Sequence, residues 1–209
     1  MNYQMHRPAT FTKIVLALSI IVPVAGCGGG NSTKGPMVVL PSQAAGYRTT
    51  LAHPFTFGDI YVTNSGNKPI TLWKVSLVAP SPGVSIVGTA VRHATMHTFS
   101  LAGDANWPPS SSDAKRYYTG LQALRGFVIP APTGGSDPGA QILVGISQNQ
   151  AGRGLIKSFE ITYRSGSDTF IAVVPYSVAM CVEATGMCRL PALPKLPDST
   201  AVEMPDTTS

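Results

Sequence analysis

The feature that most constrains the fold is a succession of short apolar stretches, each bounded by turn residues, across residues 46–190. In Ser158–Arg164, apolar and polar residues alternate, so that Phe159, Ile161 and Tyr163 share one face of an extended strand. Short strands separated by glycine, proline and asparagine turns are typical of antiparallel sandwiches. About 145 residues also suit one domain. The sequence therefore predicts a single, all-β, antiparallel sandwich.

The other stretches have the same character. Turns are expected at Asn64–Pro69, Pro80–Gly83 and Arg164–Asp168, where turn-forming residues gather. Gly58 and Asp59 separate two alternating sets that are out of phase, which indicates a β-bulge. The further strands predicted are Phe55–Phe57, Ile60–Val62, Ile70–Val78, Val84–Val91, Gly126–Ile129, Gln141–Ser147 and Thr169–Val182.

Two local predictions concern side-chain direction. In Ile70–Val78 we expect Trp73, Val75 and Leu77 on one face of the strand. In Ser112–Gly126, a capping serine and a stripe of Tyr117, Leu121 and Leu124 indicate a helix, although Gly120 weakens it.

The N-terminus has the parts of an export signal. Arg7 and Lys13 precede the apolar run Ile14–Val22, which is short for a permanent membrane span. Val24-Ala25-Gly26-Cys27 follows, and it resembles the lipobox of bacterial lipoproteins. The resemblance implies removal of residues 1–26, acylation of Cys27, and a membrane-anchored protein on the periplasmic or extracellular side of the envelope. A plain signal peptide or an anchor helix is the alternative.

After Cys27, the glycine-rich run Gly28–Gly35 predicts a flexible tether, and we place the tether at residues 27–45. Residues 191–209 are rich in proline and end acidic, so we expect a disordered tail. Removing Arg7 and Lys13 lowers the formal charge from +5 to +3. The basic residues are scattered, which argues against a nucleic-acid partner.

Of the three cysteines, Cys181 and Cys188 remain once Cys27 is assigned to lipid. A disulfide is the default expectation in an exported chain. A redox pair generally has two intervening residues rather than six, and a tetrahedral metal site would need two more ligands.

Val62–Val78 resembles the Asn-x-Gly-x-x-Pro hairpin of bacterial immunoglobulin-like and fibronectin-like sandwich domains, and Phe127–Ile146 resembles their proline–glycine loop before a core strand. The likeness implies an immunoglobulin-like sandwich at residues 46–190 with a long inserted loop. It does not imply one activity, because such folds serve many purposes.

The sequence offers three candidate sites: a copper site, a binding loop and a pair of carboxylates for hydrolysis. His93, Met96 and His97 are residue types that bind copper, with His53 as a further ligand, although on a strand Met96 would point away from the two histidines. The inserted loop, Leu101–Gly120, offers interface-type side chains. They are Trp107, Arg116, Tyr117 and Tyr118. The alternative is that Trp107 caps the edge of the sandwich and the tyrosines pack on its core.

Hydrolase chemistry has the weakest support. The sequence has neither a Gly-x-Ser-x-Gly elbow nor a His-Glu-x-x-His pair, and Asp104 with Asp113 could form a carboxylate pair only by chance of folding. We therefore predict no enzymatic activity and no cofactor. The expected function is a lipid-anchored binding or scaffold module for an envelope protein or glycan. Copper handling by the His93–His97 cluster is the alternative.

Overall fold

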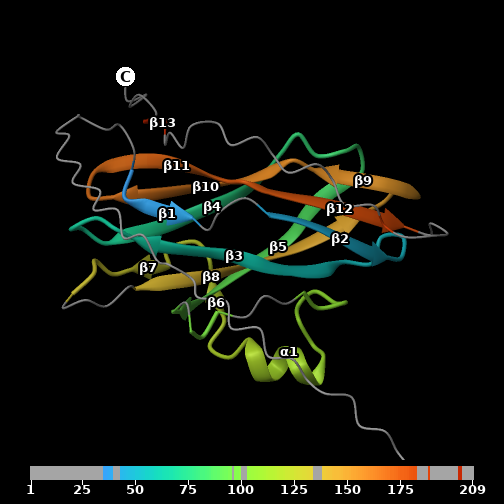
Figure 1. Cartoon of the computed structure of the whole chain (residues 1–209), viewed down its shortest axis with the longest axis horizontal. Coiled ribbons are helices and arrows are strands. Elements are labelled where there is room, and N and C mark those ends of the chain that lie inside the picture. The colour runs from blue at the N-terminus through green and yellow to red at the C-terminus, as the bar shows by residue number, and fades with distance from the viewer. Residues whose placement is uncertain are drawn as a thin grey trace, which may run out of the picture. The chain divides into compact units, whose positions relative to one another are not determined.

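The computed structural model describes residues 35–39, 43–95, 97–99, 103–133, 138–182, 188 and 202–203, which all lie within one compact unit, Ser32–Ser209. Figure 1 shows their arrangement. The elements in these ranges are β1 (Met37–Val39), β2 (Gln43–Thr49), β3 (Phe55–Asn64), β4 (Ile70–Val78), β5 (Val84–Ala94), α1 (Ser112–Tyr117), β6 (Gln122–Ala123), β7 (Val128–Ile129), β8 (Gly139–Gln148), β9 (Gly152–Ile156), β10 (Ser158–Ser165), β11 (Asp168–Val174), β12 (Tyr176–Val182) and β13 (Val202–Glu203).

Two sheets of five strands form the sandwich. The first sheet has the order β1-β3-β8-β5-β6 and the second has the order β13-β11-β10-β4-β7. A third group, β2-β12-β9, extends the second sheet. Only Lys157 separates β9 from β10, and only Pro175 separates β11 from β12, so these four strands make one long antiparallel hairpin.

The strand order identifies the class of sandwich. In an immunoglobulin-like domain, the strands lettered A, B, E and D form one sheet and C, F and G form the other. Here β1-β3-β8-β5 and β4-β10-β11 follow that order. The first strand is shared between the sheets, because β1 pairs antiparallel with β3 whereas β2 pairs parallel with β12. The prediction of an all-β, immunoglobulin-like antiparallel sandwich is confirmed.

The core lies between the two sheets. The pairing of β3 with β8 shifts register between Phe57 and Ile60, which confirms the bulge predicted at Gly58 and Asp59. Because of this bulge, the side chains of Phe57 and Ile60 are both fully buried. The Phe57 ring stacks on the ring of Phe159 from the opposite sheet, with centroids 5.1 Å apart.

A second bulge overturns one prediction. Trp73 was expected to share a face with Val75 and Leu77, and this is wrong. In the pairing of β10 with β4, Thr162 faces Lys74 and Tyr163 faces Leu72, so Trp73 is the extra residue. The Trp73 side chain is 39% exposed, whereas Leu72 and Val75 are buried.

The predicted helix is shorter than expected. It ends at Tyr117, because Tyr118 leaves the helical conformation and Gly120 has a φ of +71°. Two residues later the chain enters β6, which pairs with β5. The predicted stripe is also wrong at Tyr117, which is 48% exposed, while its neighbour Tyr118 is buried.

The ends of the sandwich also differ from the expected boundaries. The first strand begins at Met37, ahead of the expected start at Gly46, because the first strand of the fold is divided between β1 and β2. In the tail, Val202 and Glu203 pair with Ile171 and Phe170 of β11, so the expectation of a disordered tail does not extend to these two residues. The remaining tail residues lie outside the described part of the chain.

The predicted disulfide is confirmed. Cys181, near the end of β12, is bonded to Cys188, with Cα atoms 5.7 Å apart. A disulfide of this kind fits a chain that folds in an oxidising, exported environment. None of the helices in the described residues is long and apolar enough to cross a membrane.

Candidate functional site

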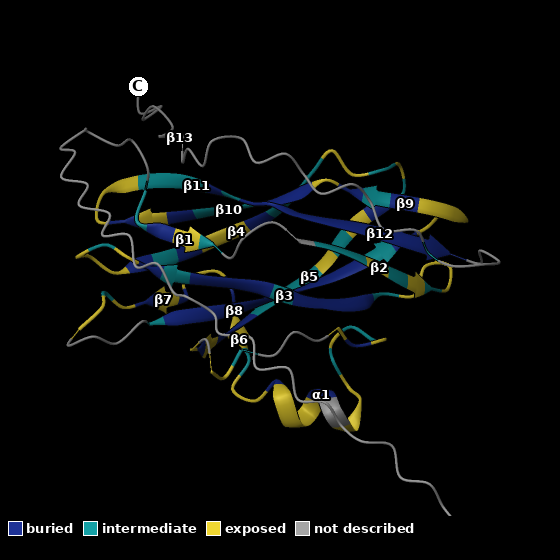
Figure 2. Ribbon diagram, viewed as in Figure 1, coloured by how far each residue is buried: buried dark blue, intermediate teal, exposed yellow. Residues whose placement is uncertain are grey.

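The two sheets differ in what covers their outer faces. Every residue of β8 except Ser147 is buried, although its side chains point alternately to the two faces of the first sheet. Figure 2 shows β8 and the adjoining part of β3 as continuously buried, with α1 beside this sheet. The described part of the inserted loop packs on this outer face and forms a small second core there. Its members are Ala114, Tyr118 and Leu143, with Ala90, Trp107 and Leu121 against them.

Asp104 fastens the inserted loop to the sheet. Its backbone exchanges two hydrogen bonds with Thr56 of β3, at 2.8 and 3.1 Å. Its carboxylate accepts hydrogen bonds from the backbone N–H groups of Asn106 and Ser111 and from the Ser111 hydroxyl, at 2.8, 3.1 and 2.5 Å. Burial alone would raise the pKa of Asp104, but the hydrogen bonds from Ser111 and Asn106 outweigh it and lower the pKa. Asp104 is therefore a structural anchor with an occupied carboxylate.

The predicted binding residues of the loop divide into two pairs. The Trp107 ring lies directly over Gly88 and Gly145, where only glycine leaves room for it. Tyr118 is buried against the sheet, whereas Arg116 and Tyr117 are exposed on α1. Two of the three aromatic side chains of the predicted site, Trp107 and Tyr118, thus pack within the protein. The side chain of Asp113 lies outside the described residues, so its pairing with Asp104 stays untested.

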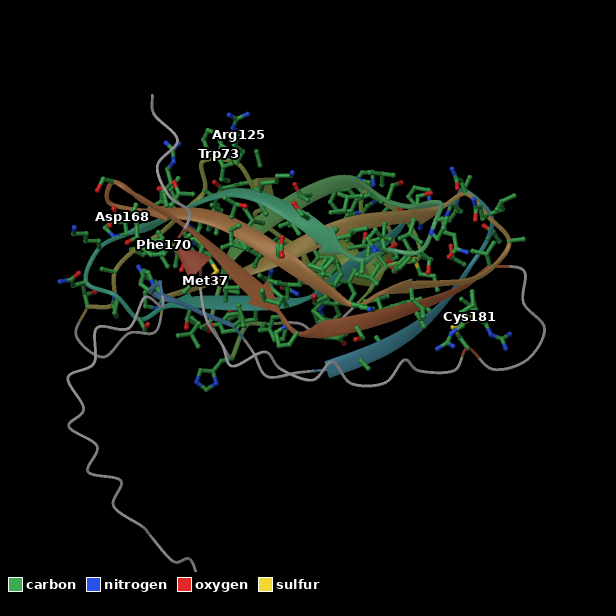
Figure 3. The ribbon with its side chains drawn as sticks, turned by 90° about the horizontal axis from the view of Figure 1, so that it is seen from above. Met37, Trp73, Arg125, Asp168, Phe170 and Cys181 are labelled. Carbon is green, nitrogen blue, oxygen red and sulfur yellow. A yellow bond between two sulfur atoms is a disulfide. The ribbon has the colours of Figure 1, made fainter. Side chains whose placement is uncertain are left out.

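The outer face of the second sheet is open by comparison. Exposed side chains stand on β4, β7 and β10 and on the segment between β6 and β7. Figure 3 shows Trp73 and Arg125 projecting away from the ribbon on this side. We call this surface the Trp73 face, and define it by Trp73, Lys74, Arg125, Val128 and Arg164.

Strand pairing brings these residues together. Val128 on β7 faces Thr71 on β4, and Thr71 faces Arg164 on β10, so the three lie in one row across the sheet. The backbone of Leu72 bonds to Gly126 and Phe127, at 2.9 and 2.8 Å, which places Arg125 beside Trp73. Gly126 has a φ of +87°, a conformation that glycine adopts at little cost, so it makes the turn after Arg125.

Two guanidinium groups lie over the Trp73 ring. The Arg125 Cζ is 3.9 Å from the ring centroid and the Arg164 Cζ is 5.0 Å from it, both within cation–π range. No described acidic side chain forms a salt bridge with either arginine. The arrangement orients two guanidinium groups whose N–H donors are available to an anion, beside exposed apolar surface from Trp73 and Val128. Sequence reasoning missed Arg125 and Arg164, because nothing in the local sequence places them next to Trp73.

The predicted copper ligands lie in two separate places on the first sheet, with His93 and His97 in one and His53 in the other. The His93 ring packs against the Phe127 ring, with centroids 4.4 Å apart, and His97 is exposed in the following turn. Met96 lies outside the described residues. His53 bonds to Asn106. His93 faces Ala140 of β8 whereas Phe55, just after His53, faces Ile146, so the two histidines are about 20 Å apart along the sheet.

Among the residues that the structure describes, no group of three or more His, Cys, Asp or Glu side chains has a geometry that could hold a metal ion. Copper handling therefore stays a prediction, without an observation in its favour.

A polar cluster joins the third group of strands to the first sheet. The hydroxyls of Tyr176 and Tyr47 donate to the Asp59 Oδ2, at 2.9 and 3.4 Å. Burial raises the pKa of Asp59, and the two hydrogen bonds lower it only in part. Burial and the nearby Asp59 also raise the pKa of both tyrosines, which keeps them protonated. The cluster ties β2 and β12 to the bulge in β3, while the Asp59 Oδ1 is buried without a hydrogen-bond partner among the described residues.

Cys27 and the signal segment lie outside the described residues, so the lipobox stays a prediction. The sequence matches no protein-family model and no curated protein. A solved structure similar to this chain is the ASH / PapD-like domain of human CEP192 (PapD-like domain 7). The TM-score is 0.37 and the sequence identity 7%, over 82% of this chain and 99% of that domain. A score this low carries no argument, and the fold class follows from the strand order alone.

Proposed function

We propose that the protein is a non-enzymatic binding module, held at the cell envelope by lipid on Cys27, that recognises an anionic envelope partner through the Trp73 face. The observation that carries the proposal is the exposed Trp73 under two guanidinium groups, which no described carboxylate neutralises. A single contact of an exposed arginine contributes little to protein stability, so stability alone does not explain why two arginines stack on one ring. Arginines stacked on an aromatic ring are partly desolvated and fixed in place, which suits them to bind carboxylate or phosphate.

The contrast between the two sheets supports the choice of surface. Trp107 and Tyr118 of the inserted loop pack against the first sheet and are not available to a partner. On that side, the exposed side chains of the predicted site are Arg116 and Tyr117. The outward side of the second sheet carries Trp73 and the cations Lys74, Arg125 and Arg164, together with the half-buried acid Glu160. Tryptophan and arginine are the side chains that most often dominate binding energy at interfaces.

Lipid attachment is tested on the native protein by mass spectrometry. We expect the mature chain to begin at Cys27, with its thiol carrying a diacylglyceryl group, because the small residues before it match the lipobox. Two acyl chains anchor a protein firmly where a single chain does not. A mature chain with a free Cys27 thiol, or one that begins elsewhere, would contradict the anchoring part of the proposal.

The binding surface is tested with the full mature chain carrying Cys27→Ser, so that acyl chains do not contribute. The anionic probes are alginate, a polymer of carboxylate-bearing sugars, and vesicles that contain phosphatidylglycerol. We expect Trp73→Ala to weaken retention on the probe that binds by about tenfold or more, as for a central interface tryptophan. Added salt weakens the same retention, since the contact is between charges.

The matched control is Tyr117→Ala, which removes from the inserted loop an aromatic ring that is 48% exposed, against 39% for Trp73. Retention of the Tyr117→Ala chain should equal that of the parent. If neither anionic probe retains the parent chain, or if Tyr117→Ala causes the loss and Trp73→Ala does not, the proposed binding surface is wrong.

A further inference from the structure

Resting on the proposed function, we infer that the partner of the Trp73 face is the anionic phospholipid surface of the same membrane that holds the Cys27 lipid. The acyl chains then fix the protein to the bilayer, and the Trp73 face fixes the orientation of the sandwich on it. Three independent features support this partner over a soluble glycan. They are the place where the tether enters the sandwich, the composition of the face, and the state of the Trp73 ring.

The tether enters the sandwich at the same level as Trp73. Gly35 lies against the hydroxyl of Tyr163 and the ring of Phe170. Tyr163 is paired with Leu72, the residue next to Trp73. Figure 3 shows Met37, Phe170 and Asp168 at the same end of the sandwich as Trp73 and Arg125, with Cys181 at the opposite end. The Trp73 face is therefore at the membrane-proximal end of a protein tethered from Gly35.

The length of the tether also allows the sandwich to contact the membrane that holds Cys27. Eight peptide steps join Cys27 to Gly35, and a fully extended chain of that length reaches at most about 29 Å. The point where the tether meets the sandwich, Gly35, is thus held within about 29 Å of the lipid on Cys27. Confinement to this distance makes contact between the Trp73 face and the membrane an intramolecular event with a high effective concentration.

The side chains on the face are those that favour a membrane–water interface. Tryptophan partitions to the headgroup level, and arginine and lysine near an anionic surface each contribute about 1 kcal/mol. Val128 is 45% exposed and adds apolar area beside Trp73, which is 39% exposed. Arg125, Arg164 and Lys74 supply three cations on the outward side of a sheet, a shape suited to an extended surface.

The Trp73 ring itself disfavours a sugar. Carbohydrate rings stack on open aromatic faces, but the Arg125 Cζ lies 3.9 Å from the centroid of this ring and the Arg164 Cζ lies 5.0 Å from it. The Arg125 guanidinium group occupies a stacking position that a sugar would take on this ring. Its N–H donors remain directed to phosphate, whose geometry the planar fork of arginine matches.

The inference is tested by sedimentation of the Cys27→Ser chain with vesicles of phosphatidylcholine alone, and of phosphatidylcholine mixed with phosphatidylglycerol. We expect binding to the mixed vesicles only. The double substitution Arg125→Gln with Arg164→Gln should lower the partition coefficient about 30-fold, which is about fivefold per arginine. The matched control is Lys115→Gln with Arg116→Gln, which removes the same charge from α1 beside the other sheet and should change binding less than twofold.

Alginate separates failure of this inference from failure of the proposed function. If alginate retains the chain through Trp73 while the mixed vesicles do not bind it, the lipid partner is wrong and the binding surface stands. Equal binding to neutral and mixed vesicles, or equal effects of the two double substitutions, also overturns the lipid partner. Failure on both probes overturns both proposals. A denaturation curve for each variant excludes unfolding as the cause of any loss.

Discussion

Phe159→Ala should lower the free energy of unfolding by about 3–5 kcal/mol, the range for removing a large aromatic side chain from a packed core. The side chain is fully buried and stacks on Phe57, so one ring from each sheet meets at the centre of the sandwich. Tyr176 packs edge-on against Phe57, with centroids 4.8 Å apart, and extends the same contact. Alanine leaves a cavity that β-sheets cannot close without losing register.

Denaturant titration of Phe159→Ala against Tyr117→Ala measures the effect. The second substitution removes a ring that is 48% exposed, and it should change the free energy of unfolding by less than about 0.5 kcal/mol. Similar effects of the two substitutions would mean that the two sheets do not meet at Phe57 and Phe159.

Asp104→Ala should lower the free energy of unfolding by roughly 1–2 kcal/mol at neutral pH, because part-buried hydrogen bonds from Asn106 and Ser111 lose their charged acceptor. Ser111 also caps α1 by accepting a hydrogen bond from the Ala114 N–H at 3.0 Å, so the loss extends to the helix. The inserted loop would loosen while the sandwich stays folded.

This effect depends on pH in a defined direction. The pKa of Asp104 is lowered in the folded protein, so the folded state binds its proton less readily than the unfolded state. The stability from Asp104 is fully present above the unfolded pKa of about 3.9, and it is lost as the pH falls through the lower folded pKa. The difference between the parent and Asp104→Ala should therefore shrink in acid.

Asp168→Ala is the control for Asp104→Ala. Asp168 is an exposed carboxylate in the β10–β11 hairpin, and its removal should cost less than about 0.5 kcal/mol. A cost for Asp104→Ala that is equally small, or that grows in acid, would contradict the anchoring role of Asp104.

The sandwich was predictable because the alternation of apolar and polar residues within each strand can be read from neighbouring residues alone. Phe159, Ile161 and Tyr163 are buried as their spacing implies, and the bulge at Gly58 and Asp59 follows from two alternating sets out of phase. The disulfide was also predictable, because assigning Cys27 to lipid leaves one pair of cysteines. These features depend on neighbouring residues or on simple counting.

The Trp73 face was not predicted, although one signal for it exists. The buried residues of β4 are Ile70, Leu72 and Val75, so the spacing passes from two to three at Trp73 and Lys74. That change marks a bulge that turns two successive side chains outward. Arg125 and Arg164 reach Trp73 only through strand pairing, which single-sequence patterns do not contain. The sequence likewise left open whether Trp107 packs on the sandwich or faces a partner, since Gly88 and Gly145 make room for it from other strands.

The protein has two tryptophans, and they distinguish the two candidate surfaces directly. The most direct measurement is nuclear magnetic resonance of the two indole N–H signals in the Cys27→Ser chain, with vesicles containing phosphatidylglycerol or alginate added. Binding through the Trp73 face should shift or broaden the Trp73 indole signal and leave that of Trp107, packed over Gly88 and Gly145, unchanged. A change confined to the Trp107 signal, or no change in either with both probes, would contradict the account.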